Sequence, residues 1–165
     1  MKKKEYRETD THVYFWRGEF SNWYPCIFRY EDHTFYNSEQ AFMWVKAKFF
    51  DDDEIAKQLL VETNPQYAKA LGRKVKNFND EMWAVASFPA MIAVNYAKWS
   101  SSHFMMDTIL STNPKILVEA SPYDKIWGVG LRQDDDLILD KNNWKGMNLL
   151  GKALMNVRKE IMEEG

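Results

Sequence analysis

Hydrophobic and polar positions alternate with helical spacing over residues 38–50, SEQAFMWVKAKFF. Glu39, Phe42, Met43 and Lys46 stand at i, i+3, i+4 and i+7, which places them on one stripe of a helix. Two of these four residues are charged, on the side that an amphipathic helix normally turns toward the core. This stripe therefore combines a packing face with a carboxylate and an amine that lie two turns apart.

The rest of the pattern predicts a mixture of helices and short strands. Strand-like runs cover 11–16 and 116–120, and a hairpin is expected over 26–36. Further helices are expected to open at 51–54, at 65, at 80 and at about 148, with Pro89 kinking or dividing the third of these. Residues 121–136 are expected to be irregular, with one short extended piece.

These elements predict an α+β fold: one helix-rich domain over 11–165 with a small β-hairpin or sheet. A polar, flexible segment over 1–10 is expected to precede it. The length of 165 residues fits a single domain, and 45% hydrophobic with 28% charged residues is typical of a globular chain.

Composition and charge narrow the possible functions. Aromatic residues make up 15% of the chain and include seven Trp, which either enlarge the core or line a site for planar or sugar-like ligands. The net charge of −2 gives no basic footprint for duplex nucleic acid, so a nucleic-acid substrate would need a local patch. No signal-peptide h-region and no membrane-length apolar run occur, which favours a cytoplasmic protein.

The residues that commonly bind metals give no ligand pattern. Cys26 is the single cysteine, which excludes an internal disulfide framework and a cysteine zinc cluster. The three histidines, His12, His33 and His103, have no ligand spacing. The carboxylates at 51–54 suit a helix N-terminus better than a metal site. No metal and no redox cofactor are therefore expected.

Several polar residues stand among aromatics and are candidates for a site. They are Arg17, Asn22, Glu39, Lys46, Arg73, Trp83, Asp124 and Trp127. Each has an ordinary structural interpretation as well: a carboxylate in the first turn of a helix is favoured by the helix dipole, a lysine can extend out of the core, and a tryptophan can belong to the core. The residues alone leave both interpretations open.

Five segments, in order along the chain, resemble the NADAR (YbiA-like) family. They are FSNWYP (20–25), SEQAF with its following lysine (38–46), LGRKV (71–75) with Trp83 downstream, LVEASPYDKIWGVG (117–130) and NLLGKALMNVR (148–158). The resemblance implies a small helix-rich α+β fold and N-glycosidase activity on ribosyl–base bonds. One branch of the family acts on phosphoribosylated pyrimidine intermediates of riboflavin synthesis, and another removes ADP-ribose from nucleobases, chiefly guanine. Val129 stands where riboflavin-branch sequences tend to carry an acidic residue, which favours the ADP-ribosyl branch.

The resemblance also implies roles for the candidates. Glu39, Lys46 and Asp124 are expected to be catalytic. Glu39 would stabilise the ribosyl cation or activate water, and Lys46 would either bind the substrate as a cation or attack the sugar carbon as a neutral amine. The resemblance implies substrate-binding roles for Asn22, Arg73, Trp83 and Trp127. Arg17 is expected to bind substrate as well, because a guanidinium fork suits a phosphate.

Two rival classes stay open beside the enzyme. A non-catalytic module would grip an ADP-ribose or nucleotide group with its tryptophans and release nothing. A structural interaction protein would instead present a large exposed apolar patch. The expected partner of the enzyme is an ADP-ribosylated nucleobase or nucleic acid, or a phosphoribosyl small molecule, with no membrane and no obligate protein partner.

Overall fold

The computed structural model describes residues 4–165, which divide into two compact units. We call residues 22–103 the central unit, and the described residues before and after them the terminal unit. Of the segment expected to be flexible, 1–3 lie outside the described residues, and part of the remainder forms strand β1 (Tyr6–Glu8). The single domain over 11–165 stays a prediction. In the described part of the chain, no helix is long and apolar enough to cross a membrane.

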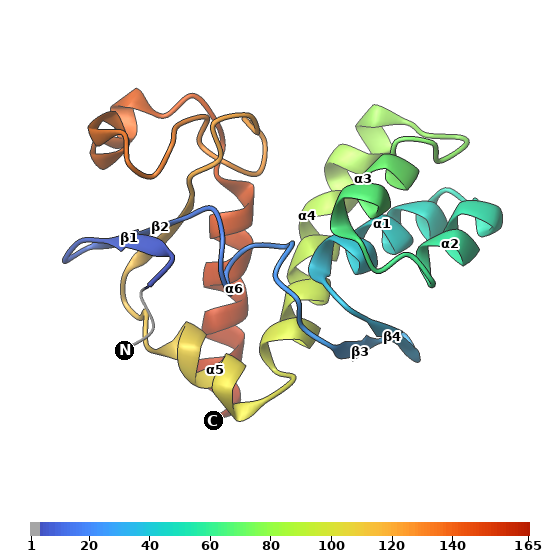
Figure 1. The fold of residues 1–165 in the computed structure, drawn as a ribbon, viewed down its shortest axis with the longest axis horizontal. Helices are drawn as coiled ribbons and strands as arrows, with labels where there is room; N and C mark the ends of the chain where they lie inside the picture. The colour runs from blue at the N-terminus through green and yellow to red at the C-terminus, as the bar shows by residue number, and fades with distance from the viewer. Residues whose placement is uncertain (1–3) are drawn as a thin grey trace. The chain divides into compact units, whose positions relative to one another are not determined.

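The terminal unit is built on a three-stranded sheet (Figure 1). Strand β2 (His12–Phe15) lies in its centre, antiparallel to β1 and parallel to β5 (Ile116–Glu119). Helix α6 (Leu149–Glu164) packs on β5, and α5 (His103–Leu110) precedes that strand in the chain. Two 3-10 turns, Asp136–Leu139 and Lys141–Asn143, complete the unit. Its core cluster is Tyr14, Val118, Ala120, Val129, Leu131 and Ile138.

The start of α6 explains why the terminal unit needs the sequence NLLG. Asn148 has a left-handed backbone (φ 53°), which asparagine adopts more readily than most residues. Its buried side chain donates to the Leu117 carbonyl (3.0 Å) and accepts from the Glu119 amide (2.9 Å). A Cβ at Gly151 would collide with the same Leu117 carbonyl. Asparagine and glycine thus allow the helix to approach β5 closely.

The central unit contains a β-hairpin and four helices. The hairpin joins β3 (Phe28–Tyr30) to β4 (His33–Phe35) through Glu31 and Asp32, both with positive φ. The helices are α1 (Ser38–Phe49), α2 (Asp53–Leu59), α3 (Pro65–Gly72) and α4 (Asp80–Trp99). Helix α1 contacts the other three helices, so it forms the centre of this unit (Figure 1).

Two sequence-based expectations need correction. Of the two outcomes expected for Pro89, division is wrong, because α4 is continuous from Asp80 to Trp99, and a kink stays a prediction. Proline removes the bond to the carbonyl four residues earlier, and here Val85 and Pro89 are both exposed, so water can satisfy that carbonyl. The extended piece expected within 121–136 is not a strand, since this fully described segment consists of turns, bends and irregular backbone ending in a 3-10 turn.

Candidate functional site

The first turn of α1 is fixed by three hydrogen bonds that hold Glu39 in place. The Asn37 side chain caps the helix by accepting from the Gln40 amide at 2.8 Å. The Gln40 side chain accepts from the Tyr36 amide at 2.8 Å, close to a reciprocal capping box. The Glu39 amide donates to the Asn22 carbonyl at 3.0 Å. The FSNWYP loop is thereby tied to the backbone of Glu39, whose catalytic role stays a prediction.

The side chain of Asn22 is engaged within the protein. It is buried, and it accepts from the Asn95 amide group at 3.3 Å while its own amide lies 3.4 Å from the Met91 sulfur. Both partners belong to α4. These contacts give Asn22 a structural task, that of joining the loop to α4 behind the start of α1, and its substrate-binding role stays a prediction.

Lys46 lies two turns along the same stripe of α1 in a perturbed environment. Its ammonium donates to the Gly72 carbonyl at 2.9 Å and lies 4.5 Å from the centre of the Phe78 ring. Burial, and secondarily the positive charge of Arg73, lower the pKa of the Lys46 amine, while Asp80 and Glu39 oppose that shift. A lysine with a lowered pKa is closer to the neutral amine that nucleophilic catalysis requires.

Trp83 is enclosed by phenylalanine rings of α1 and its end. The ring centres of Phe42, Phe49 and Phe50 lie 5.3, 5.8 and 6.1 Å from that of Trp83, all in tilted arrangements. Trp83 is half-buried, so part of its surface is accessible despite this packing. The ring therefore contributes to the core of the central unit and also presents an apolar surface.

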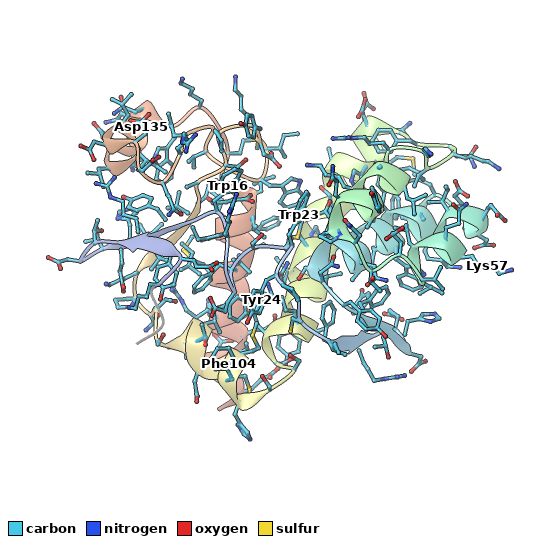
Figure 2. The ribbon with its side chains drawn as sticks, in the orientation of Figure 1. Trp16, Trp23, Tyr24, Lys57, Phe104 and Asp135 are labelled. Atoms are coloured by element: carbon cyan, nitrogen blue, oxygen red, sulfur yellow. The ribbon has the colours of Figure 1, made fainter. Side chains whose placement is uncertain are left out.

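In the terminal unit, aromatic contacts join the loop of Arg17 to the loop of Asp124. The Arg17 guanidinium lies 5.4 Å above the ring of Trp16, which is labelled in Figure 2. The Trp16 ring in turn lies 6.3 Å from that of Tyr123, which is 82% exposed. The exposed Arg17 and the loop of Asp124 are thus linked by aromatic contacts within one unit.

Asp124 shapes the loop that carries Trp127. Its Oδ1 accepts from the amides of Ile126 (2.9 Å) and Trp127 (2.8 Å). Gly128 follows in a confined position, where a Cβ would lie 2.9 Å from the Asp124 carbonyl and from Ser121. Both of these hydrogen bonds end on the same carboxylate oxygen.

The structure thus divides the predicted site residues between the two units. Asn22, Glu39, Lys46, Arg73 and Trp83 belong to the central unit, and Arg17, Asp124 and Trp127 belong to the terminal unit. The sequence did not predict that Phe78 and the Gly72 carbonyl contact Lys46, because both contacts depend on how the connection between α3 and α4 folds. Among residues 4–165, no group of three or more His, Cys, Asp or Glu residues could hold a metal ion.

Comparison with known proteins identifies the family to which this fold belongs. The NADAR domain model matches residues 13–162. An N-glycosidase of Acanthamoeba polyphaga mimivirus is 36% identical over 93% of this chain and 98% of its own length. The protein irg-1 of Caenorhabditis elegans is 41% identical over 75% of this chain, which spans 59% of that protein. The NMR structure of the E. coli protein YbiA superposes with a TM-score of 0.77 at 25% identity, over 97% of this chain and 90% of that one.

The chain therefore belongs to the NADAR family. The likeness to YbiA confirms the predicted helix-rich α+β fold. The relatives named as N-glycosidases confirm the prediction of an enzyme that hydrolyses N-glycosyl bonds.

Proposed function

We propose that this enzyme hydrolyses the bond between the anomeric carbon of an ADP-ribosyl group and a nucleobase nitrogen, with guanine in nucleic acid or nucleotides as the base. The observation that carries the proposal is the shared stripe of α1, where Glu39 and a lysine of lowered pKa stand two turns apart. Their Cα atoms are about 10 Å apart on an ideal helix, so side chains can approach one ligand from two ends.

The chemistry assigns distinct tasks to these two residues. Cleavage of the C–N bond builds positive charge on the anomeric carbon, and a carboxylate beside that carbon stabilises the cation or deprotonates the attacking water. We assign this task to Glu39. Water supplies the new hydroxyl on carbon, and its proton ends on the leaving nitrogen, so the products are free ADP-ribose and the intact base.

Lys46 has two possible tasks, and they make different predictions. As a cation it binds a hydroxyl or phosphate oxygen of the substrate. As a neutral amine it displaces the base at the anomeric carbon, after which the sugar ring opens to an imine that water hydrolyses. Its lowered pKa supports the second task, and its bond to the Gly72 carbonyl supports the first.

The remaining candidates are assigned to binding. Arg73 of the central unit is exposed, and its guanidinium group suits a phosphate of the ADP-ribosyl group. The exposed Arg17 of the terminal unit has the same chemistry, and its substrate-binding role stays a prediction. Trp83 of the central unit is half-buried and offers a ring face for a base, a contact worth about 1–3 kcal/mol per stacked base. Trp127 of the terminal unit is also half-buried, and its substrate-binding role stays a prediction. Asp124 contacts a ribose hydroxyl or the leaving base.

The test is a side-by-side assay of the purified chain on two substrates. One is an oligonucleotide that carries ADP-ribosylated guanine, and the other is the phosphoribosylaminopyrimidine of riboflavin synthesis. Release of free ADP-ribose with restoration of guanine supports the proposal. Cleavage of the pyrimidine substrate alone would replace it with the riboflavin-pathway activity, and retention of the oligonucleotide without release would indicate a binding module.

A further inference from the structure

The connection between α3 and α4, residues 72–80, holds the end of the Lys46 side chain from two directions. The Gly72 carbonyl accepts from the ammonium at 2.9 Å, and the Phe78 ring centre lies 4.5 Å from the same nitrogen. A cation within about 6 Å of a ring centre is attracted by the negative face of the ring. The amine is therefore fixed by a carbonyl and by an aromatic ring.

The carbonyl end of this arrangement depends on a glycine. Gly72 is the last residue of α3, where unsatisfied carbonyls give the helix a partial negative charge that favours a cation. A Cβ at Gly72 would occupy the space taken by the Met43 side chain of α1. The close approach of α3 to α1 thus places the carbonyl within reach of Lys46.

The ring end is held by a second phenylalanine. Phe78 meets Phe50 at the end of α1 edge-on, with ring centres 5.4 Å apart and planes at 67°. Phe78 is 43% exposed, which is far more than is usual for a residue of a hydrophobic core. Phe50 therefore packs against the ring, and part of the ring surface stays exposed.

We propose that Phe78 is a positioning residue for Lys46, whose ring face holds the ammonium at the C-terminal end of α3. The catalytic meaning of this contact rests on the function proposed above, whereas the contact itself does not. A substrate hydroxyl or phosphate can replace the ring face without breaking any backbone structure. Phe78 thereby keeps the Lys46 ammonium in one position when no substrate is bound.

Three charged side chains also affect the pKa of Lys46, and they are kept in every Phe78 variant. They are Glu39 on its own helix, Arg73 at the end of α3 and Asp80 at the start of α4. None of them changes when Phe78 is replaced, and Leu or Met in its place keeps apolar bulk beside the amine. A change in the titration of Lys46 in such variants therefore reports loss of the ring.

The experiment measures the pH dependence of Lys46 acetylation by acetic anhydride, read by mass spectrometry. Exposed Lys57 of α2, labelled in Figure 2, serves as the internal reference. In Phe78→Leu and Phe78→Met we expect the midpoint for Lys46 to fall by about half to one pH unit, because the ammonium loses its ring. Phe78→Tyr, which keeps a ring, should titrate like the wild-type protein.

Phe49→Leu is the matched control. Phe49 is 41% exposed and also packs edge-on against Phe50, at 4.9 Å, but in the described residues no cation lies over its ring. In Phe49→Leu, the pH midpoint of Lys46 acetylation should equal that of the wild-type protein. An unchanged or raised midpoint in folded Phe78→Met, or an equal fall in Phe49→Leu, overturns the proposal. The readout needs no substrate, so it is independent of whether the chain cleaves an ADP-ribosyl bond.

Discussion

Helix α1 of the central unit and the 121–130 loop of the terminal unit both carry family motifs, but they use polar residues differently. In the loop, the Asp124 carboxylate accepts from two backbone amides, and Gly128 fits where a larger residue would collide. On α1, the Lys46 ammonium is held by a carbonyl and a ring face, with its pKa lowered. Asp124 thus stabilises the turn of its own loop, whereas the Lys46 amine is available to a substrate.

A large effect on turnover is expected when the Lys46 amine is removed. Lys46→Met should lower turnover by about 10²-fold or more, because it removes either the nucleophile or a charge-assisted contact. Lys46→Arg distinguishes the two, since arginine keeps the charge but cannot form an imine. Steady-state cleavage assays measure the loss, and borohydride trapping of a covalent adduct identifies the imine.

Lys48→Met is the matched control for this prediction. Lys48 lies on the same helix, is exposed and pairs with Asp53 at 2.9 Å. A comparable loss of turnover in this variant would mean that the effect is not specific to Lys46. The contrast between α1 and the loop would then lose its basis.

A smaller effect is expected at the contact that brings the Gly72 carbonyl to Lys46. Gly72→Ala should reduce the free energy of unfolding by about 1–3 kcal/mol, because the new Cβ overpacks against Met43. Urea denaturation measures the change. In a Met43→Ala background, Gly72→Ala should reduce the free energy of unfolding much less than it does in the wild-type protein. Additive effects of the two substitutions would contradict this packing account.

The loop carboxylate should matter to stability by a smaller amount. Asp124→Ala removes the acceptor for the amides of Ile126 and Trp127, and about 1 kcal/mol of unfolding free energy is expected to be lost. Asp124→Asn keeps an oxygen in the same place and should unfold close to the wild-type protein. If both variants were equally destabilised, the charge of Asp124 rather than its turn would be the stabilising feature.

The smallest effect is a pH dependence of stability that arises from Lys46. Its pKa is lowered in the folded state, so the unfolded chain binds more protons between the folded and unfolded pKa values. Below the folded pKa, the buried charge of Lys46 lowers the free energy of unfolding by its whole amount. This destabilisation decreases as pH rises toward the unfolded pKa near 10.4. Lys46→Met should therefore show a smaller rise in stability than the wild-type protein over this alkaline range, as measured by urea unfolding at several pH values.

Local signals in the sequence predicted much of the central unit. The stripe of α1 and the hairpin expected over 26–36 depend on neighbouring residues, and the structure has both. Strand β1 was not predicted, because its pairing with β2 compensates for a polar sequence. Phe78 was missed because its contact with Lys46 depends on the path of a connection 32 positions along the chain, which no periodicity encodes.

The central claim is that the charged stripe of α1 performs the reaction, and Glu39→Gln tests it most directly. The measurement is turnover of the substrate that the wild-type protein cleaves, together with its dissociation constant, with exposed Glu54→Gln of α2 as the control. We expect turnover to fall by about 10²–10³-fold or more while binding stays within a few-fold, because the carboxylate acts on charge that develops in the transition state. Near-normal turnover in Glu39→Gln would show that this carboxylate is structural and would contradict the account.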